Sequence, residues 1–493
     1  MKDYLTISQA RDGLKNKEFS SVELTKHYLE KIDEFKELNA FITVEPEKAL
    51  EAAKKADENI AKDRDAPLLG VPIAVKDLFC TKGTRTTAAS KILSEFVPEY
   101  ESTVTRNLLD NGAVFIGKTN MDEFAMGSTN ITSYFGPCFL RYRSRSNKEE
   151  PLVPGGSSGG SATAVASDLC VAAIGSDTGG SIRQPAAFSG LVGIKPTYGL
   201  CSRYGMVAFA SSLDQAGPLA KNVKDAAIML QSMASYDDKD STSEKVDIPN
   251  YSDAVGQSVK GMKIGIAKEF TEGLSRENAA LLEKAEEWLV EAGCELVNIS
   301  LKTVPYALPT YYIIAPAEAS SNLARYDGVR YTLRSEDSQS IDDLYANSRT
   351  EGFGEEVKRR ILTGTYVLSA GFYDAYYAKA LKIRRMIRDD FQCNAFSKVD
   401  MVLTLTTPSA AFGINKSNSM SPVEMYLNDI FTVTANIAGI PGISTPAGLS
   451  LDGLPMGVQL LGPRFSEASL FKTAAVIEKS ADFENLRKTI SLG

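Results

Sequence analysis

Two segments rich in glycine and serine could carry nucleophilic chemistry. The first spans residues 154–161 (PGGSSGGS) and the second spans residues 175–185 (GSDTGGSIRQP). Both place serine hydroxyls beside accessible backbone N–H groups, which an acyl-transfer nucleophile and its oxyanion site require. Residues 162–174 between them predict a helix and then a strand, which a flexible linker would not contain. The second segment also offers four consecutive small residues whose N–H groups could converge on an oxyanion, with the serine at the tip: Thr178, Gly179, Gly180 and Ser181.

A base for such a nucleophile is available in Lys76, which follows the apolar run 70–75. The pKa of a solvated lysine is about 10.4, and burial after an apolar strand would lower it. The adjacent carboxylate of Asp77 would oppose that shift, so we expect it to face away from Lys76. One lysine and two serines could then form a proton relay without histidine. The alternatives are a solvated lysine at a strand end and glycine turns that only pack a helix against a sheet.

The single histidine, His27, limits the alternatives. Ser20 and Glu23 fit a capping box, and the apolar spacing that follows predicts an amphipathic helix containing His27. A Ser-His-Asp triad would need this residue in the active site. A zinc hydrolase would usually need two or three histidines, and the six cysteines show no paired metal spacing. We therefore expect a Ser-Lys type of hydrolase without a metal.

The composition is that of a globular protein with a large core: 493 residues, 43% of them hydrophobic and 24% charged. The net charge of −8 argues against a nucleic-acid surface that acts alone, and leaves open RNA that is handled through a partner. The N-terminus is charged and has a helical pattern, unlike a signal peptide, and no apolar stretch approaches the roughly 20 residues of a membrane span. We expect a reduced, soluble, cytoplasmic protein.

Residues 112–119 (GAVFIGKT) satisfy the P-loop pattern, but we reject ATP binding at this position. In a P-loop, the four variable residues form a loop whose N–H groups wrap phosphate. These four are Ala-Val-Phe-Ile, which predict a buried strand instead.

Helical and strand patterns alternate along the chain. A helix at 103–111 is followed by a strand at 113–117, and strands at 263–267 and 294–299 flank a helix at 277–292. This order predicts a mainly parallel sheet covered by helices. The polar stretches 235–252 and 334–340 are expected to be surface connections, and neither forces a domain boundary.

Residues 70–77 (GVPIAVKD), 155–161 (GGSSGGS) and 177–186 (DTGGSIRQPA) resemble the motifs of the amidase signature family, and residues 453–459 (GLPMGVQ) extend the resemblance toward the C-terminus. The resemblance implies an α/β fold, a single α/β/α domain around a large mixed sheet that spans residues 1–493, with a helical segment at about 1–60 packed on the core. It assigns Ser181 as nucleophile, Ser157 as a bridging serine, usually on a cis peptide, and Lys76 as base. The N–H groups of Thr178 to Ser181 would form the oxyanion hole.

Four further segments resemble the glutaminase subunits of tRNA-dependent amidotransferases within that family: 195–199, 209–215, 318–328 and 351–354. This implies glutamine hydrolysis and transfer of ammonia to a B subunit, which amidates Glu-tRNA(Gln) with ATP and Mg, while a small C subunit clasps the pair. No cofactor in this chain and no membrane are implied. Stand-alone hydrolysis of small or acyl amides and a non-catalytic scaffold role are the rival functions.

Three matching positions, Tyr311, Arg360 and Asp429, would hold the glutamine zwitterion. An arginine suits the α-carboxylate and an aspartate suits the α-ammonium group. Ordinary surface ion pairs are the alternative for these residues. One segment departs from the family pattern: residues 138–150 are longer and more basic than the usual Asn-Pro-aromatic-Asp stretch. We expect a solvated insertion there, with a tRNA contact as the alternative.

Overall fold

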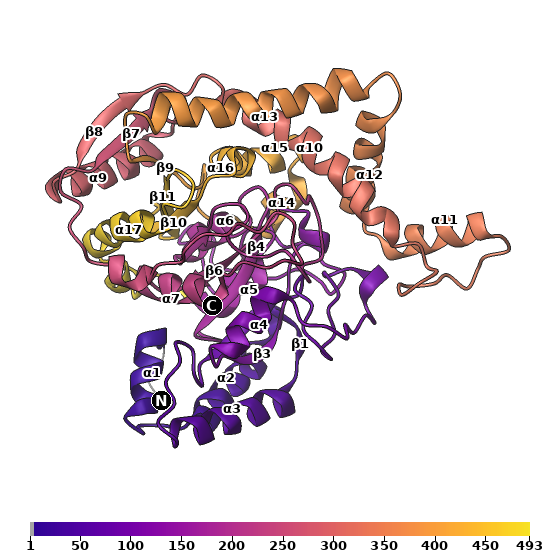
Figure 1. The fold of residues 1–493 in the computed structure, drawn as a ribbon, viewed down its shortest axis with the longest axis horizontal. Coiled ribbons are helices and arrows are strands. Elements are labelled where there is room, and N and C mark those ends of the chain that lie inside the picture. Colours follow the sequence, from indigo (N-terminus) through magenta and orange to yellow (C-terminus); the bar gives the residue numbers. More distant parts are fainter. Residues whose placement is uncertain (1–3) are drawn as a thin grey trace.

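An eleven-stranded mixed sheet runs through the centre of the molecule, with helices on both faces (Figure 1). The computed structural model describes residues 4–493. The strands are β1 (Phe41–Val44), β2 (Pro72–Lys76), β3 (Val114–Thr119), β4 (Ala172–Asp177), β5 (Val192–Lys195), β6 (Gln215–Ala220), β7 (Lys263–Ala267), β8 (Glu295–Ile299), β9 (Met401–Leu405), β10 (Gly442–Leu449) and β11 (Pro455–Leu461).

The strands lie in the order β1-β3-β2-β4-β6-β5-β10-β11-β9-β7-β8. Parallel pairs occur in two groups, β3-β2-β4 and β9-β7-β8. The other six of the ten pairings are antiparallel, so the expectation of a mainly parallel sheet was wrong. The reason is that several connections in the centre of the sheet are hairpins or irregular loops: β10 and β11, for example, are joined by a short turn at Gly453, whose φ is +75°.

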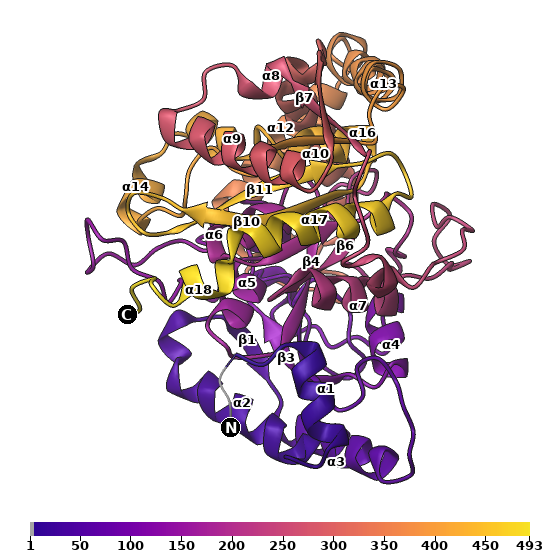
Figure 2. The same cartoon turned by 90° about the vertical axis from the view of Figure 1, so that its left-hand side faces the viewer.

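The helices in chain order are α1 (Ile7–Lys15), α2 (Ser21–Glu34), α3 (Pro46–Ile60), α4 (Thr103–Asp110), α5 (Gly159–Ala166), α6 (Arg183–Ser189), α7 (Val223–Met233), α8 (Lys268–Thr271), α9 (Arg276–Glu291), α10 (Ala307–Asn322), α11 (Ile341–Gly352), α12 (Glu355–Leu368), α13 (Lys379–Asp390), α14 (Ile414–Ser419), α15 (Pro422–Tyr426), α16 (Val433–Ala438), α17 (Glu467–Ala481) and α18 (Phe483–Arg487). Helices α7, α9 and α17 form one layer, and α17 runs along β10 (Figure 2). Helices α5 and α6 pack against the central strands on the other face and are buried at every position.

The local elements agree with the sequence. Helix α4 ends just before Gly112, whose φ is +88°, and β3 follows. The P-loop-like stretch therefore lies mostly within a strand, whose backbone pairs with β1 and β2. Its lysine, Lys118, is buried and contacts Asp77 at 3.3 Å. Helix α2 begins with the expected capping box of Ser20 and Glu23, and His27 lies within this helix.

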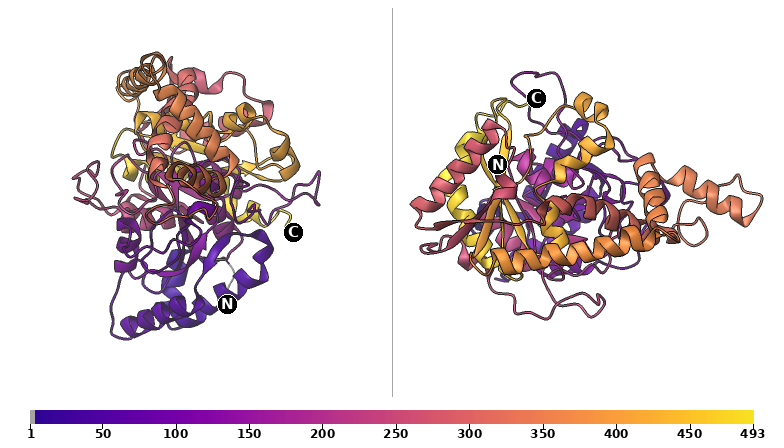
Figure 3. Two further views of the ribbon diagram at one scale, coloured as in Figure 1. Left: turned by 90° about the vertical axis from the view of Figure 1, so that its right-hand side faces the viewer. Right: turned by 90° about the horizontal axis from the view of Figure 1, so that it is seen from above.

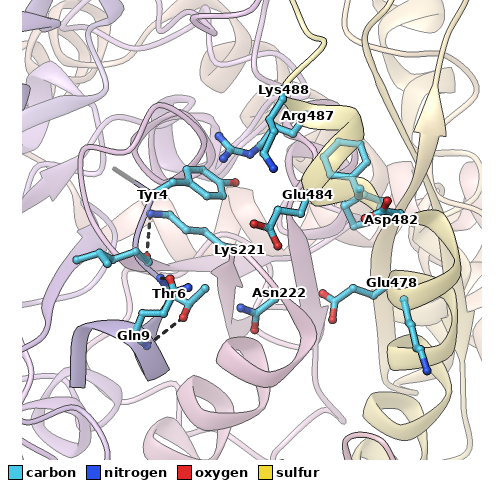
Figure 4. A pocket seen from close by; sticks show the side chains of 14 residues that line it. Tyr4, Thr6, Gln9, Lys221, Asn222, Glu478, Asp482, Glu484, Arg487 and Lys488 are labelled. Atoms are coloured by element: carbon cyan, nitrogen blue, oxygen red, sulfur yellow. Dashed lines mark hydrogen bonds between the residues drawn. The ribbon is translucent and has the colours of Figure 1, made fainter. Parts of the chain in front are cut away.

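The N-terminal region is anchored to the core by buried polar contacts. Lys221 Nζ donates hydrogen bonds to the Leu5 carbonyl at 3.0 Å and to Asp168 Oδ1 at 2.7 Å. Asp225 accepts the N–H of Ile7 at 2.8 Å. A pocket of about 640 Å³ lies at this junction, with walls from residues 4–9 and from the C-terminal residues 478–488 (Figure 4). The region also contains β1, which joins the sheet edge beside β3, and residues 1–3 of the expected segment lie outside the described part of the chain.

An extended helical arm follows β8. Helix α10 packs against both α12 and α13, and α11 projects away from the body (Figures 1 and 3). The segment 138–150 is a solvated insertion only in its second half. Residues 145–149 are exposed, whereas Leu140 and Tyr142 are buried, and Tyr142 makes a β-bridge with Leu492 near the C-terminus. The apolar residues at its start explain this correction, because they pack into the core.

Candidate active site

Lys76 lies at the centre of a buried cluster of serine hydroxyls. It is the last residue of β2 and is fully buried. Its Nζ lies within hydrogen-bonding distance of three hydroxyls: Ser157 Oγ at 2.7 Å, Ser158 Oγ at 2.9 Å and Ser176 Oγ at 2.9 Å. Each acceptor is uncharged, so the site can hold a neutral amine without leaving a carboxylate unpaired.

Burial lowers the pKa of Lys76 to about 7, and the more distant carboxylates of Asp122, Asp177 and Asp214 oppose this shift. The expected orientation of Asp77 is confirmed. Its Oδ2 accepts the backbone N–H of Thr87 at 2.9 Å, and its Oδ1 contacts Lys118 at 3.3 Å. Because the Asp77 carboxylate interacts with Thr87 and Lys118 and not with Lys76, it does not hold Lys76 in its charged form, and the amine can lose its proton near pH 7.

Ser157 lies in the first glycine-serine segment, directly before α5. The Gly156–Ser157 peptide is cis, as the family resemblance implied. The segment is tightly enclosed: a Cβ at Gly156 would lie 2.2 Å from Asp122 Oδ2. The Asp122 N–H donates to the Ser157 carbonyl at 3.3 Å. Only glycine therefore fits beside the serine at this position.

Ser181 lies in the second segment, directly before α6, and is 8% exposed, whereas Lys76 and Ser157 are 0% exposed. Of these three residues, Ser181 is the one that a substrate can reach. The Ser181 carbonyl accepts the Ser158 N–H at 3.3 Å, which joins the two segments. The structure thus brings both serine segments and the lysine into one site.

A buried ion pair holds the loop that contains Ser181. Arg183 contacts the Asp177 carboxylate through Nε at 3.1 Å and through Nη2 at 3.0 Å, and both residues are 0% exposed. Asp177 Oδ2 also accepts the N–H of Ile182 at 3.2 Å. Asn436 donates to Asp177 Oδ1 at 2.8 Å and accepts from Arg183 at 2.6 Å. Both ends of the loop are fixed by this network.

The glycines between Thr178 and Ser181 are required by close neighbours. Gly180 has φ +143°, and a Cβ there would lie 2.2 Å from Thr432 Oγ1. The same hydroxyl donates to the Gly179 carbonyl at 2.7 Å. A Cβ at Gly179 would lie 2.8 Å from the Tyr311 hydroxyl. Backbone N–H groups can therefore approach a reacting carbonyl at this loop without steric interference from side chains.

Tyr311 and Arg360 approach the loop from the helical arm, and Asp429 from the segment before α16. All three are at most 7% exposed, so they are not ordinary surface residues. Tyr312, the residue after Tyr311, contacts both Asp429 and Arg360. Its hydroxyl donates to Asp429 Oδ2 at 3.2 Å, and its ring centroid lies 5.6 Å from the Arg360 guanidinium carbon. A cation and an anion thus lie close together beside the loop that contains Ser181.

Burial raises the pKa of Asp429 to about 7, although hydrogen bonds from Ser128 and Tyr312 and the charge of Arg360 oppose this shift. No cationic side chain donates a hydrogen bond to this carboxylate among the described residues; its donors are the hydroxyls of Ser128 and Tyr312. Such a carboxylate is suited to an incoming ammonium group, which would lower its pKa again.

Sequence reasoning missed several residues of the site. Ser158 and Ser176 both contact Lys76. Ser158 follows Ser157 directly, and Ser176 lies within the second glycine-serine segment, but neither was expected to face the lysine. Asp177 and Arg183 stand within the second motif, and their spacing at the two ends of a loop could have indicated a clamp. Tyr312 follows Tyr311 directly, but nothing in the sequence indicates its contact with Asp429.

Residues 4–493 contain neither a candidate metal-binding cluster nor a candidate membrane-spanning helix. No group of three or more His, Cys, Asp or Glu side chains in this part of the chain is arranged to hold a metal ion. None of the described helices is both long and apolar enough to span a membrane.

This fold and site define an amidase. A model of the amidase family matches residues 23–471, and the chain belongs to that family. Among its relatives are the A subunits of glutamyl-tRNA(Gln) amidotransferase from Xanthobacter autotrophicus and Azorhizobium caulinodans, at 58% and 59% identity. These alignments cover 97% of this chain, and 96% and 97% of the respective relatives.

Solved structures agree with this relationship. The A subunit of the glutamyl-tRNA(Gln) amidotransferase of Thermotoga maritima matches with a TM-score of 0.77 at 40% identity, covering 96% of this chain and 94% of that one. The native peptide amidase of Stenotrophomonas maltophilia matches with a TM-score of 0.83 at 30% identity, covering 97% of both chains. The large mixed sheet expected from the family resemblance is confirmed.

Proposed function

We propose that this chain is the glutaminase subunit of a tRNA-dependent amidotransferase that converts Glu-tRNA(Gln) to Gln-tRNA(Gln). The observation that carries the proposal is the buried Lys76 amine, 2.7 Å from Ser157 Oγ, next to the loop that presents Ser181. The identity of 58% over 97% of the chain favours this function over a stand-alone amidase, since the peptide amidase is only 30% identical. The presence of all three relay residues disfavours a scaffold.

The relay begins with neutral Lys76. Its Nζ accepts the proton of Ser157, which takes the proton of Ser181 as Ser181 Oγ attacks the side-chain amide carbon of glutamine. A lysine with a pKa of about 7 is half neutral at physiological pH, which suits a general base. Ser158 and Ser176 accept hydrogen bonds from the same amine and keep it directed at the relay.

The carbonyl oxygen of the substrate becomes an oxyanion in the tetrahedral intermediate. The N–H groups of the loop from Thr178 to Ser181 stabilise it, and the Asp177–Arg183 pair keeps that loop in place. The proton returns through the relay to the leaving nitrogen, and ammonia departs. Water then hydrolyses the γ-glutamyl ester, which releases glutamate and restores Ser181. The sum is glutamine and water converted to glutamate and ammonia.

Substrate recognition is assigned to a charge clamp. Arg360 binds the α-carboxylate, Asp429 binds the α-ammonium group, and Tyr311, which lies close to Gly179, is the third residue that holds the zwitterion. The clamp residues are at most 7% exposed, and the low effective dielectric of such a site strengthens both contacts.

The ammonia is used on a partner. By relationship to the amidotransferase relatives, a B subunit binds Glu-tRNA(Gln) and uses ATP and Mg to activate the glutamyl group, and a C subunit holds the heterotrimer together. This chain then needs no cofactor of its own, and the complex works in the cytoplasm with its tRNA. Residues 1–493 act as one amidase unit, with the N-terminal helices packed on the core.

The test is a glutaminase assay of the full chain, alone and after addition of the partner subunits, ATP and Glu-tRNA. We expect release of glutamate and ammonia that requires Ser181, and Gln-tRNA formation only with the partners. Turnover of small acyl amides without preference for glutamine would favour the stand-alone amidase. Co-purification with the partners but no hydrolysis would favour the scaffold.

A further inference from the structure

The guanidinium of Arg360 is held by a resident carboxylate on its own helix. Arg360 Nε donates to Glu356 Oε1 at 2.8 Å, one turn earlier in α12. Among the described residues this is the only hydrogen-bond partner of the Arg360 side chain. Its side chain is 5% exposed, and Nη1 and Nη2 have no protein acceptor but are not fully buried, so a ligand can reach them.

Aromatic rings complete the enclosure. The guanidinium carbon lies 5.4 Å from the centroid of Phe209 and 5.6 Å from those of Tyr312 and Tyr426. Tyr312 and Tyr426 stack on each other with centroids 3.8 Å apart. Rings restrain a guanidinium through their faces but accept no in-plane hydrogen bond from it. The in-plane direction of the fork is therefore set by Glu356.

Glu356 is itself well restrained. It lies in the first turn of α12, where the helix dipole favours a negative charge. The Tyr426 hydroxyl approaches Glu356 Oε1 at 3.4 Å, and Arg359 pairs with the other carboxylate oxygen. Its side chain is 15% exposed. An ordinary i,i+4 surface pair lacks this burial and these additional partners.

We propose that Glu356 is a positioning residue for substrate binding: it takes the Nε edge of Arg360 and so presents the Nη1/Nη2 edge to the α-carboxylate of glutamine. A guanidinium can bind a carboxylate with two parallel bonds through either edge. With one edge occupied by Glu356, the other is left for the substrate. The inference rests on the clamp role of Arg360 in the proposed function.

The test compares three amides with the full chain in its complex. Glutamine carries both charged groups, 4-carbamoylbutanoate lacks only the α-ammonium group, and 4-aminobutanamide lacks only the α-carboxylate. For Glu356→Ala we expect KM to rise about 10-fold for the two carboxylate-bearing amides, because one charge-assisted contact is misaligned. The kcat for these amides and the kcat/KM for 4-aminobutanamide should stay within about twofold. Glu356→Gln, which keeps an acceptor, should recover part of the loss.

Glu355→Ala is the matched control. Glu355 lies beside Glu356 in the first turn of α12, pairs with Lys358 at 2.8 Å, and has a side chain that is 86% exposed. Glu355→Ala should leave KM and kcat for all three amides unchanged. Equal losses of Glu356→Ala on all three amides would reduce Glu356 to a structural role and overturn the inference. A lower KM for glutamine would also overturn it, because Glu356 would then compete with the substrate for Arg360.

Arg360→Ala separates this inference from the proposed function. If Arg360→Ala does not discriminate between amides with and without the carboxylate, the clamp itself is wrong. If Arg360→Ala discriminates and Glu356→Ala does not, only the role of Glu356 is wrong. If both are right, the double variant should lose no more than Arg360→Ala alone, since the two residues act on one contact.

Discussion

The Asp177 carboxylate and the Arg183 guanidinium form a buried bidentate pair across the loop that contains Ser181. The two contacts measure 3.0 and 3.1 Å, and the same carboxylate accepts the N–H of Ile182 at 3.2 Å. Gln459 accepts a hydrogen bond from Arg183 Nη1 at 3.0 Å, and Asn436 accepts one from Nη2 at 2.6 Å. The pair thus connects the nucleophile loop to β11 and α16.

We expect Arg183→Met to lower the free energy of unfolding by roughly 3–5 kcal/mol, because it leaves the Asp177 carboxylate buried and unpaired. Denaturant titration followed by circular dichroism measures this loss. The double variant Asp177→Asn/Arg183→Met removes both charges and should be more stable than the single variant. A single variant as stable as the unmodified chain would show that the pair does not anchor the loop.

Ser181→Ala should abolish glutaminase activity and leave the fold intact, because Ser181 is the one relay residue that a substrate can reach. In the complete complex, free ammonium should restore amidation of Glu-tRNA by this variant, since the acceptor chemistry is on the partner. Mass spectrometry of a trapped acyl-enzyme should place the adduct on Ser181. An adduct on another serine would contradict the assignment of Ser181 as nucleophile. If saturating ammonium fails to restore amidation by an intact complex, the acceptor chemistry is not on the partner.

Local structure could be predicted from the sequence because its causes are local. Gly112 has a φ of +88° and follows the end of α4, and Gly293 has a φ of +93° and follows the end of α9. Ser20 caps the N-terminus of α2. The strand pairing could not be predicted in the same way. Strand β4 lies between β2 and β6, and this neighbourhood depends on contacts between residues far apart in the chain. That is why the alternation of helices and strands suggested a mainly parallel sheet, whereas the family resemblance correctly implied a mixed one.

The candidate site shows the same division. Lys76, Ser157 and Ser181 stand in recognisable motifs, and the structure places Lys76 against Ser157. Which other hydroxyls face the lysine depends on the path of the chain around Ser158 and Ser176, and sequence spacing does not reveal it. The contact between Tyr312 and Asp429 joins residues 117 positions apart, so it could only be found in the structure.

If Arg360 and Asp429 form a charge clamp, loss of each residue should affect a different one of the two truncated amides. Loss of a charge-assisted contact costs roughly 1.5–3 kcal/mol, which is about a 10- to 150-fold loss in kcat/KM. Arg360→Ala should lose this much on glutamine and little on 4-aminobutanamide, which has no carboxylate. Asp429→Asn should lose it on glutamine and little on 4-carbamoylbutanoate, which has no ammonium group. Steady-state kinetics with the three amides measures both patterns, and equal losses on all of them would assign these residues to structure.

The pH dependence should report Lys76 and Asp429 together. Lys76 must be neutral to act as a base, and Asp429 must be ionised to bind the ammonium group; burial brings both pKa values to about 7. For glutamine, kcat/KM should therefore rise with pH through about 7, and its logarithm should approach a slope of 2 well below that pH. For 4-carbamoylbutanoate only the Lys76 requirement remains, and the slope should approach 1. The same slope for both amides would remove Asp429 from the profile.

Lys76 can be tested separately through stability. The pKa of this lysine is about 7 in the folded chain and about 10.4 when it is solvated, so between these values the unfolded state binds more protons. Its contribution to the free energy of unfolding should rise with pH across this window, by up to roughly 1.4 kcal/mol per pH unit, and fall as the pH drops toward 7. Subtracting the curve of Lys76→Met from that of the unmodified chain isolates this contribution from those of the other buried lysines. A difference that does not change with pH would show that Lys76 stays charged.

The same residue decides whether the relay is correct. Lys76→Ala should cost at least about 100-fold in kcat/KM, the lower end for loss of a general base. Lys76→Arg should not recover the activity, because a guanidinium remains protonated at any pH at which the protein is folded. Circular dichroism of both variants must first show an intact fold, since each leaves the hydroxyls of Ser157, Ser158 and Ser176 without the Lys76 amine. An active Lys76→Arg enzyme with an unchanged pH profile would exclude Lys76 as the base. The buried hydroxyl cluster would then be only a means of satisfying a buried amine, and the proton of Ser181 would have to leave by another route.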